Sequence, residues 1–130
     1  MTMPATKHQI GFVLLEGFSM IAFSNAIEAF RMANYVSNQD LYHFSVTGLT
    51  GAHTSASNHI SVNHTAQMSD LLRCDLIFVC GGFDLNKLKN SGLRTWLQRY
   101  AQKGAALGGV CTGAFALADA GLLNDYRASI

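Results

Sequence analysis

Charged residues, prolines and long apolar runs are all scarce in this chain of 130 residues. Only 13% of the residues are charged against 49% that are apolar, a composition that excludes intrinsic disorder. The nine lysines and arginines are scattered and the net charge is +1, so we expect no direct contact with nucleic acid. No apolar run approaches the roughly 20 residues that span a bilayer, and no basic leader precedes one. We expect one cytoplasmic domain over residues 1–130, without a membrane partner.

Paired cysteines and metal-binding clusters are also missing. Cys74, Cys80 and Cys111 are odd in number and form no C-x-x-C pair, so we expect neither a disulfide framework nor a zinc site. His59 and His64 are five residues apart, and on one strand they would point to opposite faces. No glycine pair has the spacing, or the following lysine, of a phosphate-binding loop. We therefore expect no metal and no cofactor.

Short apolar runs alternate with helical stripes along the chain. Ser19 is a helix cap, and one stripe after it is formed by Met20, Phe23, Ile27 and Phe30. This alternation predicts an α/β fold with a mostly parallel sheet covered by helices on both faces. The expected strands are His8–Leu15, Tyr42–Gly48, Ile60–Val62, Leu76–Cys80 and Ala105–Val110, with another beginning at Arg127–Ile130. The expected helices run from Ser19 to about Asn34, from Asn90 or Ser91 to Gly104 and from Thr112 to Ala120. Because a sheet rarely ends by opening a strand, we expect the domain to be truncated at its C-terminus.

The segment Gly109–Gly113 joins a buried strand directly to a helix. It has the form of a nucleophile elbow with cysteine in the serine position. At the start of the helix, the Cys111 thiol would be favoured as a thiolate or would lie beside a bound anion. The backbone N–H groups of Thr112 and Gly82 are expected to converge there as an anion hole. The alternative is that Cys111 is an inert small residue in a tight turn.

A catalytic thiol needs an acid or a base within reach. Glu16 ends the first expected strand and could face the crevice at the carboxyl ends of the strands, whereas Glu28 is expected on the solvated side of its helix. Phe18 and Phe83 follow glycines at strand ends, where each ring could line a pocket or simply pack. Phe23 falls on the apolar face of its helix and is expected in the core.

Five segments of the sequence together resemble known families. FVCGGFD (Phe78–Asp84), ALGGVCTGAFALADAGLL (Ala106–Leu123) and YRAS (Tyr126–Ser129) are similar to the class I glutamine-amidotransferase-like fold, which includes the ThiJ/PfpI superfamily. GFSMIAFSNAIEAFRMAN (Gly17–Asn34) and ASNHISV (Ala56–Val62) resemble the N-terminal sensing domain of a subgroup of AraC-type transcriptional regulators. The resemblance implies a flavodoxin-like three-layer sandwich, a homodimer and a small-molecule effector. It also implies that DNA is held by a C-terminal helix-turn-helix domain absent from this chain.

One position departs from the catalytic pattern of this superfamily. Thiol-dependent members place an acidic residue early in the first helix, against the cysteine, and the matching position here is Ala22. The resemblance therefore implies a non-catalytic domain that senses an amino-acid-like or betaine-like metabolite. The cation of such a ligand would contact aromatic faces, and its carboxylate would bind in the anion hole. The alternative is a cysteine-dependent ThiJ/PfpI-type hydratase, amidase or glyoxalase-like enzyme with Cys111 as nucleophile. The residues expected to contact the ligand are Glu16, Phe18, Phe23, Gly81, Gly82, Phe83, Cys111 and Thr112.

Overall fold

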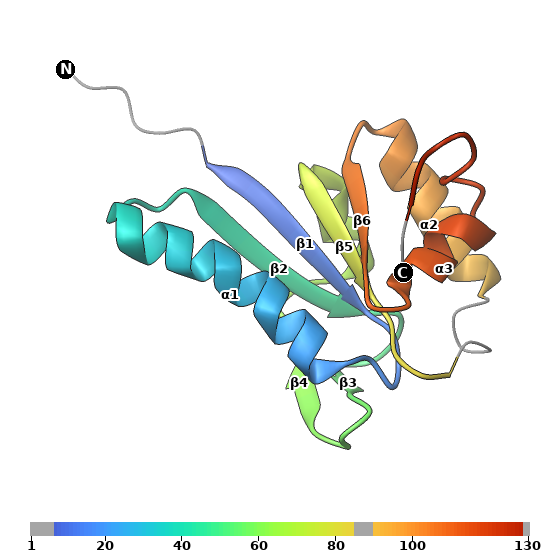
Figure 1. The fold of residues 1–130 in the computed structure, drawn as a ribbon, viewed down its shortest axis with the longest axis horizontal. Coiled ribbons are helices and arrows are strands. Elements are labelled where there is room, and N and C mark those ends of the chain that lie inside the picture. The colour runs from blue at the N-terminus through green and yellow to red at the C-terminus, as the bar shows by residue number, and fades with distance from the viewer. Residues whose placement is uncertain (1–6, 85–89, 129–130) are drawn as a thin grey trace.

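The computed structural model describes residues 7–84 and 90–128, which form a sheet with helices on both faces (Figure 1). The sheet has four parallel strands in the order β2-β1-β5-β6. α1 covers one face, and α2, α3 and the 3-10 helix η1 cover the other, as the predicted α/β sandwich requires. The elements are β1 (His8–Leu14), α1 (Met20–Ser37), β2 (Tyr42–Gly48), β3 (His53–Ser55), β4 (Ser61–Asn63), η1 (Met68–Arg73), β5 (Leu76–Cys80), α2 (Ser91–Gln102), β6 (Ala106–Val110) and α3 (Gly113–Asp119).

β1 lies inside the sheet because its side chains are apolar on both faces. Ile10, Phe12 and Leu14 pack toward α1, whereas Val13 and the following Leu15 pack toward α2. All five residues are buried. A strand covered on both faces appears in the sequence as a continuous apolar run, and this is why β1 could be predicted from a short segment.

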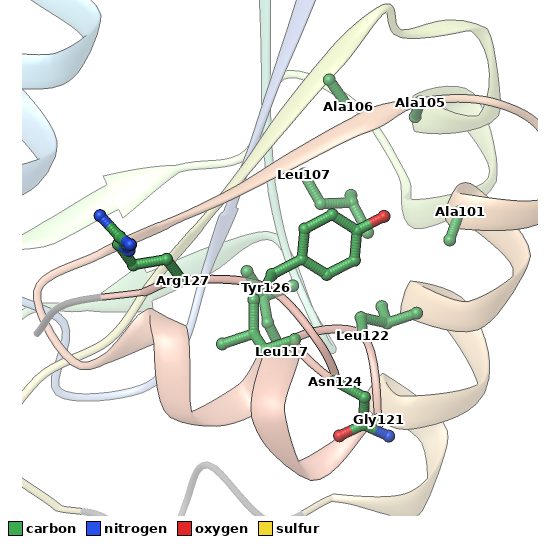
Figure 2. Close-up of a pocket in the computed structure, with 11 residues that line it drawn as sticks. Ala101, Ala105, Ala106, Leu107, Leu117, Gly121, Leu122, Asn124, Tyr126 and Arg127 are labelled. Carbon is green, nitrogen blue, oxygen red and sulfur yellow. The ribbon is translucent and has the colours of Figure 1, made fainter.

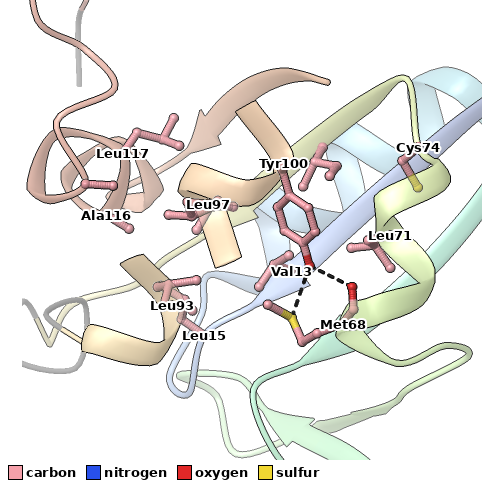
Figure 3. Close-up of a cluster of buried hydrophobic side chains, with 13 residues drawn as sticks. Val13, Leu15, Met68, Leu71, Cys74, Leu93, Leu97, Tyr100, Ala116 and Leu117 are labelled. Atoms are coloured by element: carbon pink, nitrogen blue, oxygen red, sulfur yellow. Dashed lines mark hydrogen bonds between the residues drawn. The ribbon is translucent and has the colours of Figure 1, made fainter. Parts of the chain in front are cut away.

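Each face of the sheet has its own hydrophobic core. On the α1 side, the ring of Phe12 meets Phe23 edge to face and stacks on Phe78, with ring centroids 5.5 Å apart in both pairs. On the other side, the buried hydroxyl of Tyr100 in α2 donates a 2.8 Å hydrogen bond to the carbonyl oxygen of Met68 (Figure 3). This bond satisfies a polar group that burial would otherwise penalise, and it ties α2 to η1.

α1 is longer than the sequence predicted. Its end was expected near Asn34, but the helix continues to Ser37 and is capped by Asn38, whose φ of 52° is a left-handed conformation that asparagine tolerates. The side chain of Asn34 hydrogen-bonds instead to the backbone of Leu41 and Tyr42, at the start of β2. The helix therefore ends three residues later than predicted, and Asn34 lies inside its last turn with its side chain bonded to the next strand.

The other predicted strands and helices lie within two residues of their expected ends, except at the C-terminus. β3 and η1 were not predicted, because segments of three and six residues are too short to show a period. The strand expected at Arg127–Ile130 falls partly outside the described residues, and residues 127 and 128 have no regular structure. Within the described ranges, no helix combines the length and apolar character needed to cross a membrane.

Candidate functional site

Cys111 lies exposed in the sharp turn that joins β6 to α3. Its φ is 56°, in the left-handed region that residues other than glycine rarely adopt. A reactive residue held in this conformation between a strand and a helix is the defining feature of a nucleophile elbow. The backbone therefore has the geometry that the sequence motif predicted.

The glycines on either side of Cys111 are required by close backbone approach. A Cβ atom on Gly109 would overlap the backbone nitrogen of Ala114, and one on Gly113 would overlap the carbonyl oxygen of Val79. Neither obstacle is a flexible side chain that could move away. Glycine is consequently required at position 109 for the packing of β6 against α3 and at position 113 for the packing of α3 against β5.

Hydrogen bonds hold three loops together at the carboxyl edge of the sheet, beside the elbow. The N–H group of Gly81 donates to the carbonyl oxygen of Val110 at 3.2 Å, and that of Ser19 donates to the carbonyl oxygen of Gly81 at 2.9 Å. The hydroxyl of Thr112 donates to the carbonyl oxygen of Gly82. The loops that follow β1, β5 and β6 are thus connected. The Thr112 hydroxyl thus connects the elbow to the loop that follows β5.

A hairpin that the sequence did not predict extends this connection. β3 and β4 pair antiparallel, and the N–H group of Gly17 donates to the carbonyl oxygen of Ser55 at 2.8 Å. The N–H group of Ser57 donates in turn to the carbonyl oxygen of Phe18, also at 2.8 Å. Gly17 and Phe18 belong to the loop after β1, so the hairpin is fastened to the same edge of the sheet as Cys111. The only sequence signal for it was the short apolar alternation near Val62.

The three candidate aromatic residues are placed very differently. Phe18 is fully buried and Phe23 is 6% exposed, and their rings meet edge to face with centroids 5.7 Å apart. Both rings therefore belong to the core on the α1 side, which for Phe18 is the packing alternative that the sequence left open. The backbone of Phe18 pairs with Ala56 and Gly82, and this pulls its side chain inward. Phe83 is 88% exposed and presents its ring to solvent.

The acidic candidates do not complete a catalytic set. Glu16 follows β1 and is exposed, and no hydrogen bond joins it to Cys111 in the part of the chain that the structure describes. Ala22 is half-buried in the first turn of α1, where its N–H group donates to the Ser19 hydroxyl at 3.4 Å. Glu28 is exposed and pairs with Arg31. The anion-binding role of the N–H groups of Thr112 and Gly82 stays a prediction.

A cavity of about 640 Å³ lies against the first residues of β6 (Figure 2). Its walls come from the end of α2, the start of β6, α3 and the loop that follows α3. The lining residues are Ala101, Ala105, Ala106, Leu107, Leu117, Gly121, Leu122, Leu123, Asn124, Tyr126 and Arg127. None of the predicted ligand contacts is among them. No three histidine, cysteine, aspartate or glutamate side chains of the described ranges could together hold a metal ion.

The chain is similar to transcriptional regulators over most of its own length. It is 38% identical over 121 residues to the HTH-type transcriptional regulator GbdR of Pseudomonas aeruginosa, and 40% identical over 119 residues to the HTH-type transcriptional regulator CdhR of the same species. These alignments cover 93% and 92% of this chain but only 33% and 35% of the two regulators. The chain therefore spans about a third of the length of these relatives.

A solved structure and a family model agree with this relationship. The structure of an AraC family transcriptional regulator from Pseudomonas putida matches with a TM-score of 0.83 at 34% identity, covering 92% of this chain and 64% of that chain. Residues 8–129 match the model of the DJ-1/PfpI family. The resemblance inferred from the sequence motifs is thus confirmed by two independent comparisons. The chain belongs to the DJ-1/PfpI family.

Proposed function

We propose that this chain is the effector-sensing part of a cytoplasmic, homodimeric transcriptional regulator and that it performs no catalysis. The observation that carries the proposal is its similarity, at 38% and 40% identity over more than nine-tenths of the chain, to proteins named as transcriptional regulators. In this account a separate helix-turn-helix domain binds DNA. The net charge of +1 supports this division, because phosphate contacts need many basic residues.

The proposed effector site is the carboxyl edge of the sheet around Cys111. Open α/β sheets bind ligands at this edge, where loops rather than strands provide the contacts. The bond from Thr112 to Gly82 joins the elbow to the residue that precedes the exposed ring of Phe83. Since the β3–β4 hairpin is fastened to the same edge, a ligand bound at the elbow would act on several loops at once.

The proposed effector is an amino-acid-like or betaine-like molecule, with a cation and a carboxylate. A quaternary or primary ammonium group is attracted to an aromatic face, and Phe83 offers an open ring whereas Phe18 and Phe23 are buried. The carboxylate would accept hydrogen bonds from backbone N–H groups at the elbow. This assignment keeps the predicted site and, of its three aromatic candidates, retains only Phe83 as the contact for the cation.

Two features support a non-catalytic role. Ala22 cannot exchange a proton, and the resemblance implies that it occupies the position at which thiol-dependent members of the superfamily have an acid. Glu16 is the remaining acidic candidate, but it is exposed and not bonded to the thiol. The second candidate function is a thiol-dependent enzyme. The left-handed conformation and the exposure of Cys111 favour this alternative, because both suit a nucleophile.

Isothermal titration calorimetry on the full-length protein tests the effector class. We expect at least one of glycine betaine, carnitine and arginine to bind with one site per protomer. Phe83→Leu should weaken that binding about fivefold or more, because it removes the cation–π contact. Ile60→Leu, on the exposed turn between β3 and β4, is the matched control and should leave affinity unchanged. The absence of heat with all three compounds would contradict the proposed class.

The rate at which iodoacetamide alkylates Cys111 separates the sensor from the enzyme. A sensor should react at the rate of an ordinary exposed thiol such as that of free cysteine. In an enzyme, Cys111 should be alkylated much faster at neutral pH. Glu16→Gln should then lower the alkylation rate if the Glu16 carboxylate activates the thiol. Glu28→Gln changes an acid that pairs with Arg31 and serves as the control.

A further inference from the structure

β2 forms one edge of the sheet, and half of its backbone groups point away from β1 (Figure 1). The carbonyl oxygen of Leu41, just before the strand, accepts a 2.8 Å hydrogen bond from the N–H group of His8 in β1. Because the direction of the backbone groups alternates along a strand, those of Tyr42, Phe44 and Val46 point outward. A row of outward N–H and C=O groups is a template on which another strand can pair.

The β2 strand itself carries none of the usual protection against such pairing. Natural edge strands are commonly protected by charged side chains, a proline or a bulge. The sequence of β2, Tyr42–Gly48 (YHFSVTG), contains no aspartate, glutamate, lysine, arginine or proline. Its register with β1 is continuous over all seven residues, so the strand has no bulge. A segment of high β-propensity without these devices is of the kind that pairs with further strands.

The outward backbone groups of Tyr42 are bound instead by the side chain of Asn34 in α1. The amide nitrogen of Asn34 donates to the carbonyl oxygen of Tyr42 at 3.0 Å, and its amide oxygen accepts from the N–H group of Tyr42, also at 3.0 Å. An asparagine side chain has both a carbonyl and an NH₂ group, so it offers the strand the same donor and acceptor as a peptide group. Asn34 thus takes the place that a residue of a neighbouring strand would occupy.

The outward backbone groups of Val46 are bound in a similar way by Thr65, which follows the β3–β4 hairpin. The hydroxyl oxygen of Thr65 accepts from the N–H group of Val46 at 2.9 Å, and the N–H group of Thr65 donates to the carbonyl oxygen of Val46 at 2.8 Å. The N–H group of Ala66 donates to the same oxygen at 3.2 Å. Among the described residues, no side chain or loop bonds to the backbone of Phe44, which lies between the two bound residues.

We infer that Asn34 and Thr65 close the β2 edge against pairing with the β2 strand of a second copy of this chain. Two β2 strands related by a two-fold axis run antiparallel, and in the register centred on Phe44 each Tyr42 lies opposite Val46 of the other copy. This pairing needs the outward backbone groups that Asn34 and Thr65 bind. The same register places aromatic and β-branched side chains opposite one another, which favours the pairing once the edge is open.

Either closing residue should be sufficient by itself. In the two-fold register, each outer pair consists of one Tyr42 and one Val46, so binding either residue blocks both pairs. The groups of Phe44 then remain isolated, and one residue does not hold a strand. Because Asn34 belongs to α1 and Thr65 follows the hairpin, the two sets of bonds are lost independently. The inference does not rest on the proposed effector or on the proposed dimer.

Sedimentation velocity on the full-length protein at micromolar concentrations tests the closed edge. The double variant with Asn34→Leu and Thr65→Gly should form species larger than the wild type, with association strengthened about tenfold or more. Each single variant should sediment like the wild type. Adding His43→Lys to the double variant should restore wild-type sedimentation, because this side chain is 41% exposed and a charge on an edge strand opposes pairing. A double variant that sediments like the wild type, or association that His43→Lys leaves intact, would overturn the inference.

A matched control separates edge pairing from general loss of stability. Leu97 is fully buried in the core on the other face of the sheet, so Leu97→Ala destabilises the protein without opening the β2 edge. We expect this variant to sediment like the wild type. Association of Leu97→Ala as strong as that of the double variant would show that partial unfolding drives it, and would overturn the inference.

Hydrogen exchange in the unmodified full-length protein tests the closing bonds directly. The amide hydrogens of Tyr42 and Val46 are bonded to Asn34 and Thr65, and these bonds must open before exchange. We therefore expect the amide hydrogen of Phe44 to exchange about tenfold faster, or more, than either of them. Similar rates at the three positions would overturn the inference even if the double variant does not fold. Effector binding is measured separately, so its failure is distinguishable from this result.

Discussion

The hydroxyl of Thr112 donates a hydrogen bond to the backbone carbonyl of Gly82, and this bond links the residue after Cys111 to the end of β5. Thr112 is the N-cap residue of α3, yet its side chain makes no cap bond to that helix. A hydroxyl that would ordinarily stabilise a helix is used here to hold two loops together. The elbow and the loop that carries Phe83 should consequently respond together to a ligand.

Thr112→Val tests this link, because it removes the hydroxyl and keeps the shape of the side chain. We expect a loss of about 1 kcal/mol in the free energy of unfolding, the usual contribution of one such bond. Thr112→Ser keeps the hydroxyl and should recover most of the loss. The measurement is urea unfolding followed by circular dichroism. Equal stability of the valine variant and the wild type would show that the bond contributes nothing.

Gly113→Ala should destabilise the elbow much more strongly. Its methyl group would overlap the carbonyl oxygen of Val79, and relief requires backbone movement. We expect about 1–3 kcal/mol of lost stability, the range for overpacked sites. The control is Gly92→Ala in α2, where the nearest atom is the side-chain oxygen of Asn90 at 3.1 Å rather than a backbone atom. A change of less than about 0.5 kcal/mol at Gly113 would contradict the close approach.

The three cysteines should differ in their reaction with Ellman's reagent. Cys111 is exposed, whereas Cys74 and Cys80 are buried. We expect one fast-reacting thiol in the native protein, none in Cys111→Ser, and three in the wild type after unfolding. Rapid labelling that persists in Cys111→Ser would show that the core around β5 opens more readily than its packing indicates.

Stability should fall in alkaline solution. Burial raises the pKa of Cys74 to about 11 and that of Cys80 to about 12. Thiols in an unfolded chain have a pKa of about 8.5. Above that pH the unfolded state loses thiol protons that the native state retains, and this favours unfolding. The contribution of the two buried thiols to the free energy of unfolding is therefore fully present below pH ~8.5 and is lost progressively toward pH ~12. Urea unfolding at neutral pH and at about pH 9.5 should show the decrease, and Cys80→Ala should reduce it. A slope that Cys80→Ala leaves unchanged would argue against this thiol as a source.

Asn34→Ala should destabilise the connection between α1 and β2. The Asn34 side chain donates to the carbonyl oxygen of Tyr42 and accepts from the N–H groups of Leu41 and Tyr42. Its removal leaves partly buried backbone groups without partners, for which we expect a loss of about 1–3 kcal/mol. Asn38→Ala changes the helix cap without touching these bonds and provides the comparison. A larger loss of stability with Asn38→Ala would show that the helix cap, and not the hydrogen bonds of Asn34 to β2, stabilises this end of the helix.

The sequence predicted most of the sheet and the elbow because their signals are local. A buried strand such as Leu76–Cys80 is a run of apolar residues, and the turn at Cys111 is marked by glycines on both sides. Features that depend on tertiary contacts were missed. The helix continues to Ser37, where Asn38 caps it, while the side chain of Asn34 is bonded to the start of β2. The β3–β4 hairpin is stabilised by pairing with the loop after β1.

The candidate site was only partly predictable for the same reason. Phe18 and Phe83 both follow a glycine at the end of a strand, and local sequence does not distinguish them. Phe18 is buried because its backbone pairs with two segments that are distant in the sequence, Ala56 and Gly82. Phe83 lies beyond that pairing and remains exposed. At this edge of the sheet, long-range backbone pairing decides which of the two rings is buried. The spacing of apolar residues in the sequence carries no information about that pairing.

The fate of a bound ligand tests the central claim of sensing without catalysis most directly. Full-length protein is incubated with an excess of the compound that gives a calorimetric signal, and the compound is then quantified by NMR. We expect the compound to be recovered unchanged. We also expect Cys111→Ser to bind it with the wild-type affinity within about threefold, because in this account the thiol only lines the site. Conversion of the compound over many turnovers, abolished by Cys111→Ser, would contradict the account and establish Cys111 as a nucleophile.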